Sequence, residues 1–314
     1  MRSHDQGFGT PAHASLSSDV MAKGGTGAYA ALGSLLKNTI YRQVTPEEER
    51  LLALWEAARP ESLRAFDQIP MRGSDLLCQV KLIAPHLAGK RIVFVGDHDG
   101  TSLLLGLLSS QGMIKGPAQM TLLDFDDRLL EVASALAEEH HFSERFTSRL
   151  YNVFDPLPKE LVGTFDAFYT NPPYGASNLG ASARLFITRG CELTKSEWSE
   201  GYILLPTDHE RLWTRASMMA TQSFLINHGW RVAAQLPQLH RYHLDDDAAL
   251  MSSLLCVERE AAVMHAPPLP WQGRAVNPLE IPHFYGRDVL PPYPKYIAVD
   301  GREVTSLDAS LEGE

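Results

Sequence analysis

Short apolar runs rich in Val, Ile, Leu and Phe recur along the middle of the chain, and most end at a polar or turn-forming residue. Helical patterns separate most of these runs, an alternation typical of a parallel sheet with helices on both faces. The expected strands are residues 91–96, 119–124, 147–152, 164–170, 201–206, 230–236 and 250–257. The expected helices between them are residues 101–110, 126–141, 179–194 and 208–228.

The last two expected strands are joined by residues 239–249, which carry no helical pattern. A connection without a helix favours antiparallel pairing, because parallel neighbours need a longer crossover. Seven strands with a reversed last one are the layout of class I AdoMet-dependent transferases. We therefore predict an α/β, Rossmann-like fold of this class, with a seven-stranded and mostly parallel sheet.

The segments on either side of the sheet suggest three parts. These are a helical N-terminal region at 1–88, a catalytic domain at 89–260, and a C-terminal arm and tail at 261–314. Residues 261–296 hold 8 of the 20 prolines, interleaved with Trp271, Phe284, Tyr285, Tyr293 and Tyr296. So many prolines exclude a regular helix or sheet, whereas the aromatic residues favour docking over disorder. We expect this arm to pack over or beside a cleft and to exclude water from it.

Two helix starts are marked by capping-box patterns. Thr45 and Glu48 flank Pro46, which predicts a helix that begins there and ends near residue 58. A second helix is expected at residues 75–88, before the first strand. Thr207 and Glu210 form the other capping-box pattern, at the start of the expected helix 208–228.

Composition limits the class of protein. The 314 residues are 44% hydrophobic, which is ordinary for a packed core, and no apolar stretch approaches the length of a membrane span. The N-terminus shows no apolar signal region, and three widely spaced cysteines form neither a disulfide framework nor a zinc pattern. A cytoplasmic location follows as the expectation. The net charge of −10 disfavours a broad phosphate-binding face and favours a cationic or neutral substrate.

Acidic residues follow three of the expected strands, at Asp97, Asp124 and Asp155. Each aspartate alone is more often a helix cap or a turn residue than a ligand. Together and in order, they predict a nucleoside site at the carboxyl ends of the strands. Gly96 starts the first turn, and Asp124 is placed to accept hydrogen bonds from a ribose diol.

The segment Asn171-Pro172-Pro173-Tyr174 follows another apolar strand. Its two prolines lack N–H donors and stiffen the turn, so their carbonyl oxygens and the Asn171 side-chain oxygen can accept hydrogen bonds from an amine. Tyr174 offers an aromatic face to a flat base or a cation. This tetrad suits transfer of an alkyl group from a sulfonium to an amine nitrogen. Asn171 and Tyr174 are the expected catalytic residues, and the two prolines are expected to contact the substrate.

Asp97 and Asp99 bear on which sulfonium is the donor. AdoMet and decarboxylated AdoMet differ by one carboxylate next to the amine. A loop with two aspartates favours the lone ammonium of the decarboxylated form, because a like-charge contact at ~4 Å costs about 4 kcal/mol at an effective dielectric constant of ~20. The acceptor amine must lose a proton, which Asp99 or Asp245 could take. The Asp245 run is otherwise read as a solvated loop.

A metal is not expected. His240-x-x-His243 has a ligand-like spacing, yet no cysteine or third histidine is placed to complete a site.

With these motifs in order, residues 65–258 resemble the bis(aminopropyl)spermidine synthases, a family of branched-chain polyamine synthases. The segments that carry the resemblance are Phe66–Met71, Gly96-Asp97-His98-Asp99, Asp124-Phe125-Asp126, Thr170–Tyr174, Leu185–Gly190 and Tyr242–Asp245. The resemblance implies a Rossmann-like enzyme that transfers an aminopropyl group from decarboxylated AdoMet to a spermidine nitrogen. It places Asp99 in the active centre, Phe125 at the donor, and Tyr242 and Asp245 at the substrate.

Two departures from the family pattern bear on substrate. His98 stands where the family has its middle aspartate, and Asn171–Tyr174 stands where an Asp-Pro-x-Glu type of sequence is expected. The tetrad is typical of amino-directed methyltransferases. AdoMet-dependent methylation of an exocyclic adenine amine in nucleic acid is therefore an alternative, although no basic stripe is visible. A non-catalytic interaction protein is a second alternative. A polyamine is the expected partner, and a homodimer is compatible with the sequence.

Overall fold

The computed structural model describes the core of the chain and parts of both flanks. The described residues are 26–208, 211–244, 250–260, 266–291, 293, 296–297 and 303–304.

A seven-stranded sheet forms the centre of the molecule, in the order β3-β2-β1-β4-β5-β7-β6. Strand β7 is antiparallel to both of its neighbours, whereas the other pairings are parallel. The predicted seven-stranded sheet with one reversed strand is thus confirmed. The strands are β1 (Arg91–Val95), β2 (Gln119–Asp124), β3 (Phe146–Leu150), β4 (Ala167–Thr170), β5 (Trp198–Pro206), β6 (Trp230–Arg241) and β7 (Met251–Glu260).

The central strands are buried on both faces, which explains their unbroken apolar sequences. In β1, Ile92 and Phe94 join one hydrophobic core, and Val93 and Val95 join the other. This separation follows from the two-residue period of a strand, which sends successive side chains to opposite faces.

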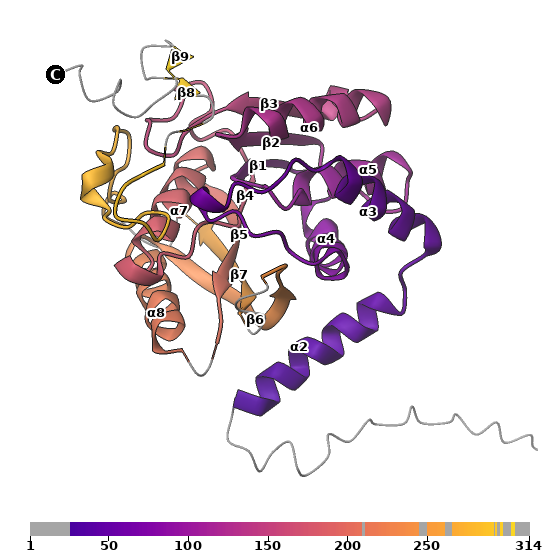
Figure 1. Cartoon of the computed structure of the whole chain (residues 1–314), viewed down its shortest axis with the longest axis horizontal. Coiled ribbons are helices and arrows are strands. Elements are labelled where there is room, and N and C mark those ends of the chain that lie inside the picture. Colours follow the sequence, from indigo (N-terminus) through magenta and orange to yellow (C-terminus); the bar gives the residue numbers. More distant parts are fainter. Residues whose placement is uncertain are drawn as a thin grey trace, which may run out of the picture.

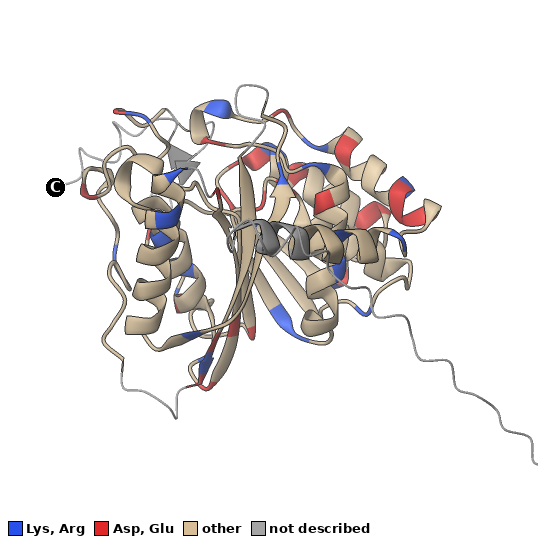
Figure 2. Cartoon of the chain, turned by 90° about the horizontal axis from the view of Figure 1, so that it is seen from below, with Lys and Arg blue, Asp and Glu red and all other residues tan. Residues whose placement is uncertain are grey.

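Helices cover the two faces of the sheet in separate layers (Figures 1 and 2). One layer holds α3, α4, α5 and α6, and the other holds α7 and α8. Helix α2 contacts β6 and α4. The helices are α2 (Thr26–Tyr41), α3 (Pro46–Ala58), α4 (Gly73–Leu87), α5 (Thr101–Ser110), α6 (Asp127–Glu139), α7 (Ala181–Leu193) and α8 (Leu212–Asn227).

Helix α3 begins as predicted and supports the loop after β1. The Thr45 side chain accepts from the Glu48 N–H, while the Glu48 side chain accepts from the Thr45 N–H. Further along α3, the Trp55 indole donates to the Asp99 carbonyl oxygen at 2.7 Å. The indole packs so closely that a Cβ on Gly100 would lie 2.2 Å from it. Glycine is therefore required at this position, where φ is also +83°.

The predicted capping box at α8 is wrong. This helix begins at Leu212 with Arg211 at its N-cap, and Glu210 lies outside the described residues. Thr207 continues the sheet instead, since its N–H donates to the Met251 carbonyl oxygen and its hydroxyl contacts Ser253. Pairing with β7 therefore keeps this residue in an extended conformation.

The described part of the C-terminal arm packs against α7. The buried Arg189 guanidinium donates to the carbonyl oxygens of Trp271 and Arg274, and it pairs with Glu192 at 2.8 Å. Phe284 and Tyr285 join the core on this face of the sheet. The arm is thus docked, as its aromatic residues predicted.

Loss of the Phe284 side chain should destabilise the protein. Phe284 is 1% exposed and lies against Phe154, with ring centroids 4.5 Å apart. Phe284→Ala should lower the free energy of unfolding by about 3–5 kcal/mol, because it leaves a cavity in the core. Leu279→Ala in the same arm is the control, since Leu279 is 82% exposed and its loss should change stability by less than about 0.5 kcal/mol. Equal midpoints in denaturant for the Phe284 variant and the wild type would contradict docking of the arm.

Charged residues of both signs are distributed over elements on both sides of the sheet (Figure 2). None of the helices in the described ranges is both long and apolar enough to cross a membrane.

Candidate active site

A cavity of about 370 Å³ opens at the carboxyl ends of the central strands. The loops after β1, β2, β3 and β4 line it, together with residues 66–69 and Tyr285 and Gly286 of the arm. In a parallel sheet the carboxyl ends of the strands share one edge, which is why the predicted strand-end residues meet here. Among them, Gly96, Asp124 and Asn171 all line the cavity.

Asp97 holds the first turn of α5. Its Oδ1 accepts from the Thr101 N–H at 3.0 Å, and its Oδ2 accepts from the Ser102 N–H at 2.7 Å. Burial raises the pKa of this carboxyl to about 8, although the hydrogen bonds from the helix oppose the shift. Asp97 lines the cavity, but its main contacts are those of a helix cap.

Asp99 and Asn171 form a pair at the cavity wall. Asp99 Oδ1 accepts from the Met71 N–H at 2.6 Å, and its Oδ2 accepts from the Asn171 amide nitrogen. Burial raises the pKa of Asp99, whereas these two donors act in the opposite direction. Since the Asn171 amide nitrogen faces Asp99, its amide oxygen is left to accept from another donor.

Asp124 links the loops after β1 and β2. Its Oδ2 accepts from the Asp97 N–H at 3.0 Å, and its Oδ1 accepts from the Asp126 N–H at 2.9 Å. Each carboxylate oxygen has a second lone pair that a ribose hydroxyl could use. Burial raises the pKa of Asp124 to about 6.

Aromatic rings form an apolar wall beside these carboxylates. Phe125 packs on Phe66 with ring centroids 4.7 Å apart, and Tyr293 of the arm lies 5.3 Å from Phe125. Tyr285 meets Phe66 edge to face at 5.2 Å. Such a wall suits a planar purine.

All four residues of the segment Asn171–Tyr174, including Pro172 and Pro173, line the cavity. The Tyr174 hydroxyl donates to the Tyr242 hydroxyl at 2.5 Å, so Tyr242 lies directly behind it. Both tyrosines are in the cavity lining.

One predicted site residue is placed differently, and another cannot be located among the described residues. Asn152, rather than Asp155, lines the cavity, because the chain turns after β3 and the Asp155 N–H donates to the Asn152 carbonyl oxygen. The Asn152 side chain holds this turn by accepting from the Phe154 N–H at 3.1 Å. Asp245 lies outside the described residues.

The cavity has a carboxylate that the sequence patterns did not assign. Asp67 follows a short 3-10 helix, has a left-handed φ of 60°, and lines the cavity. Burial raises its pKa to about 6, while Arg64, Arg287 and a hydrogen bond from the Tyr174 backbone lower it. An aspartate tolerates this backbone conformation, but nothing in the sequence marks Asp67 as facing the strand ends.

The cavity is lined by acidic side chains. Four carboxyl groups line it, and no Lys or Arg occurs among the described lining residues. The carboxyl groups are those of Asp67, Asp97, Asp99 and Asp124. With a pKa raised to about 8, Asp97 mostly holds its proton at neutral pH, whereas Asp67 and Asp124, with pKa values raised to about 6, are anionic. His98 adds no positive charge at neutral pH, because burial lowers its pKa to about 4, and its Nε2 lies 2.9 Å from the Ser62 hydroxyl. The cavity therefore favours a cationic ligand.

The described residues contain no group of three or more His, Cys, Asp or Glu side chains that could hold a metal ion. His240 is buried between Ser252 and Gln79, so its ring nitrogens both have protein partners.

Comparison with known proteins adds the family. A model of the branched-chain polyamine synthase A C-terminal domain matches residues 49–277. The chain belongs to the branched-chain polyamine synthase family. This confirms the resemblance found in the sequence, and the matched segment extends beyond it at both ends.

Relatives of this polyamine synthase family are similar over part of their length. The N(4)-bis(aminopropyl)spermidine synthase of Thermus thermophilus is 28% identical over 196 residues, which are 62% of this chain and 52% of that protein. The enzyme of the same name from Thermococcus kodakarensis is 30% identical over 149 residues, 46% of this chain and 38% of that protein. The chain thus spans about half the length of these curated relatives, or less.

A solved structure supports the same fold. The crystal structure of the Thermus thermophilus branched-chain polyamine synthase, in complex with N4-aminopropylspermidine and 5′-methylthioadenosine, aligns with a TM-score of 0.60 and 24% identity. The alignment covers 73% of this chain and 66% of that chain. The predicted Rossmann-like class I fold is confirmed by this match and by the strand order.

Proposed function

We propose that this protein transfers an aminopropyl group from decarboxylated AdoMet to a nitrogen of a polyamine. The observation that carries the proposal is the charge of the cavity, where four carboxyl groups and no Lys or Arg face the ligand among the described residues. Decarboxylated AdoMet and a polyamine are both cationic, and family membership agrees with this pair of substrates.

The cavity offers a place for each part of the donor. Asp124 would accept from the ribose hydroxyls, and Phe125 would pack on the adenine. Asp97 and Asp99 would face the propylamine end. The backbone at Gly96, directly after β1, lies against the Phe186 ring of α7. Its φ is +70°, and a Cβ there would lie 2.9 Å from that ring.

The transfer needs one bond to form as another breaks. The acceptor nitrogen attacks the propyl carbon next to the sulfonium, the C–S bond breaks, and 5′-methylthioadenosine leaves. The new ammonium then loses one proton, for which Asp99 is the proposed acceptor. The Asn171 oxygen and the Tyr174 ring would orient the acceptor nitrogen.

Titration with three ligands tests the donor. Decarboxylated AdoMet should bind at least about tenfold more tightly than AdoMet, because the AdoMet carboxylate would enter a cavity that is lined by carboxyl groups and has no Lys or Arg among its described lining residues. Neutral 5′-methylthioadenosine serves as the reference for the nucleoside part. AdoMet binding that equals or exceeds that of the decarboxylated form would overturn the proposal.

Methylation of a nucleic-acid base amine is the second candidate. The observation that favours it is the Asn171–Tyr174 segment, which lines the cavity and leaves an amide oxygen available for an exocyclic amine. The acidic lining argues against it, since neither the AdoMet carboxylate nor a phosphate backbone gains from a carboxylate-rich cavity.

Polyamine binding should weaken in acid. Asp67 and Asp124 each have a pKa raised to about 6, so both are anionic above that pH and take up protons below it. Spermidine keeps its charge over this range, so only the protein titrates. The Kd for spermidine should therefore rise as the pH falls from about 7.5 to about 5. Asp67→Asn should reduce this rise, and a Kd in the wild type that does not change with pH would contradict the assignment.

A further inference from the structure

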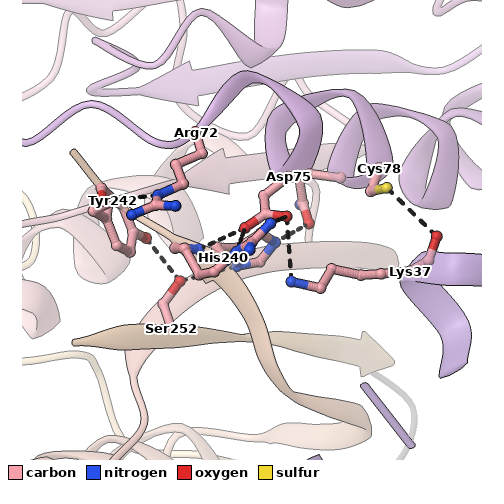
Figure 3. Close-up of polar contacts among 9 residues, drawn as sticks. Lys37, Arg72, Asp75, Cys78, His240, Tyr242 and Ser252 are labelled. Atoms are coloured by element: carbon pink, nitrogen blue, oxygen red, sulfur yellow. Dashed lines mark hydrogen bonds and ion pairs between the residues drawn. The ribbon is translucent and has the colours of Figure 1, made fainter. Parts of the chain in front are cut away.

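A chain of hydrogen bonds leads from the cavity to a buried histidine. Figure 3 shows its part from Tyr242 through Ser252 to His240. The Tyr174 hydroxyl donates to Tyr242 at 2.5 Å, and the Tyr242 hydroxyl lies 2.7 Å from Ser252 Oγ. Ser252 Oγ is 2.9 Å from His240 Nδ1, and His240 Nε2 is 2.8 Å from Gln79 Oε1. These residues come from the loop after β4, the end of β6, β7 and α4.

The chain is closed to solvent beyond Tyr174. Tyr242, Ser252, His240 and Gln79 are each at most 4% exposed. Buried hydroxyl and imidazole groups need partners, and here the members of the chain supply them to one another. The orientation of one group therefore constrains the orientation of the next.

The hydrogen-bond partners of His240 determine which group donates and which accepts at each step of the chain. In the structure the Gln79 amide oxygen faces His240 Nε2, while the buried Gln79 amide nitrogen has no hydrogen-bond partner. An amide oxygen only accepts, so this orientation of the amide places the His240 proton on Nε2. Burial lowers the pKa of His240 to about 3, so the ring is neutral and Nδ1 accepts from Ser252. Ser252 then accepts from Tyr242, and Tyr242 accepts from Tyr174. The contact between the Tyr174 and Tyr242 hydroxyls allows Tyr174 to be the donor.

We propose that His240 is a positioning residue that turns the Tyr174 hydroxyl proton away from the cavity. The Tyr174 oxygen then presents lone pairs to the ligand and accepts an N–H of the substrate amine. The proposal rests on the proposed function for the identity of that amine. It assigns His240, Ser252 and Tyr242 to the orientation of one atom at the site.

A second set of contacts fixes the position of the histidine. Asp75 and Gln79 are four residues apart on α4 and so share one face of the helix. Asp75 accepts from the Arg241 backbone N–H at 2.8 Å and pairs with the Arg241 guanidinium at 2.9 Å and with Lys37 at 3.2 Å (Figure 3). These contacts hold Arg241, the residue after His240, against α4, where Gln79 accepts a hydrogen bond from the His240 imidazole.

Ser252→Ala tests the proposal because it cuts the chain between Tyr242 and His240. We expect kcat/KM for spermidine to fall roughly ten- to hundredfold, the range for a hydrogen bond to a charged group. Ser253→Ala is the matched control: Ser253 is equally buried on the same strand but bonds to Thr207, and its loss should leave kcat/KM close to that of the wild type. In a Tyr174→Phe background, Ser252→Ala should add almost nothing. Independent effects that multiply would overturn the proposal, because a merely structural role would not act through the Tyr174 hydroxyl.

The nitrogen chemical shifts of His240 provide a readout that does not need activity. In the wild-type protein we expect a protonated Nε2 and an unprotonated Nδ1. The His240→Asn variant should keep part of the activity, because the amide oxygen of Asn can accept a hydrogen bond from Ser252. A proton on Nδ1 would reverse the chain and overturn the proposal. If the wild type transfers no aminopropyl group, the proposed function fails, while the imidazole shifts still decide the direction of the chain.

Discussion

Asp99→Asn should lower kcat by about 10²–10⁴-fold, the contribution of a positioned general base. Asn keeps the volume of the side chain and one oxygen for the Met71 N–H, which lies 2.6 Å from Asp99 Oδ1. It removes the carboxylate that we propose as the acceptor of the proton from the substrate nitrogen. The substitution also places the new amide nitrogen against the amide nitrogen of Asn171, which donates to Asp99 in the wild type. Two donors then face each other, so the Asn171 amide should lose the orientation proposed for substrate binding. Single-turnover rates with decarboxylated AdoMet and spermidine measure the effect.

Asp166→Asn is the control for this prediction. Asp166 lies at the opposite edge of the sheet, where it accepts from the Arg91 N–H at 2.8 Å and pairs with Lys195 at 2.6 Å. This variant should retain the wild-type rate. An Asp99→Asn variant that is folded and retains more than about a tenth of the wild-type kcat would show that another group takes the proton.

Asp124→Ala should weaken binding of 5′-methylthioadenosine by about 1.5–3 kcal/mol, the value of hydrogen bonds to a charged group. This corresponds to a Kd roughly 10- to 150-fold higher. Part of this loss of affinity should come from a disturbed loop structure, because the backbone N–H groups of Asp97 and Asp126 lose the carboxylate that accepts from both. Isothermal titration measures the change.

Asp127→Ala separates the ribose contact from the general effect of removing a carboxylate. Asp127 is the first residue of α6 and lies outside the cavity lining. Its loss should leave the affinity for the nucleoside close to that of the wild type. Unchanged affinity in Asp124→Ala would show that the nucleoside binds elsewhere.

The strand ends could be predicted from sequence because the underlying physics is local. Apolar runs buried on both faces give continuous strands, and turn residues mark where each one stops. Once the strands are parallel, Gly96, Asp124 and Asn171 must meet at one edge, as they do. The start of α3 was equally predictable, since both partners of the capping box lie within four residues.

The remaining features depend on contacts between distant segments. Asp67 reaches the cavity because residues 66–69 cross the carboxyl ends of the strands, and His240 bonds to a residue 161 positions away. Thr207 pairs with β7 rather than capping α8, a competition that local pattern does not reveal. The turn after β3 is a local exception: the Asp155 N–H donates to the Asn152 carbonyl oxygen, and Asn152 lines the cavity in place of Asp155, but no residue pattern marks this turn.

The mass of the product tests the central claim most directly. The purified protein is given decarboxylated AdoMet or AdoMet in turn, with spermidine and separately with DNA or RNA. The account predicts spermidine heavier by one aminopropyl unit, together with 5′-methylthioadenosine, from the decarboxylated donor. Methylated adenine or cytosine from AdoMet, with no reaction of the decarboxylated donor, would contradict it.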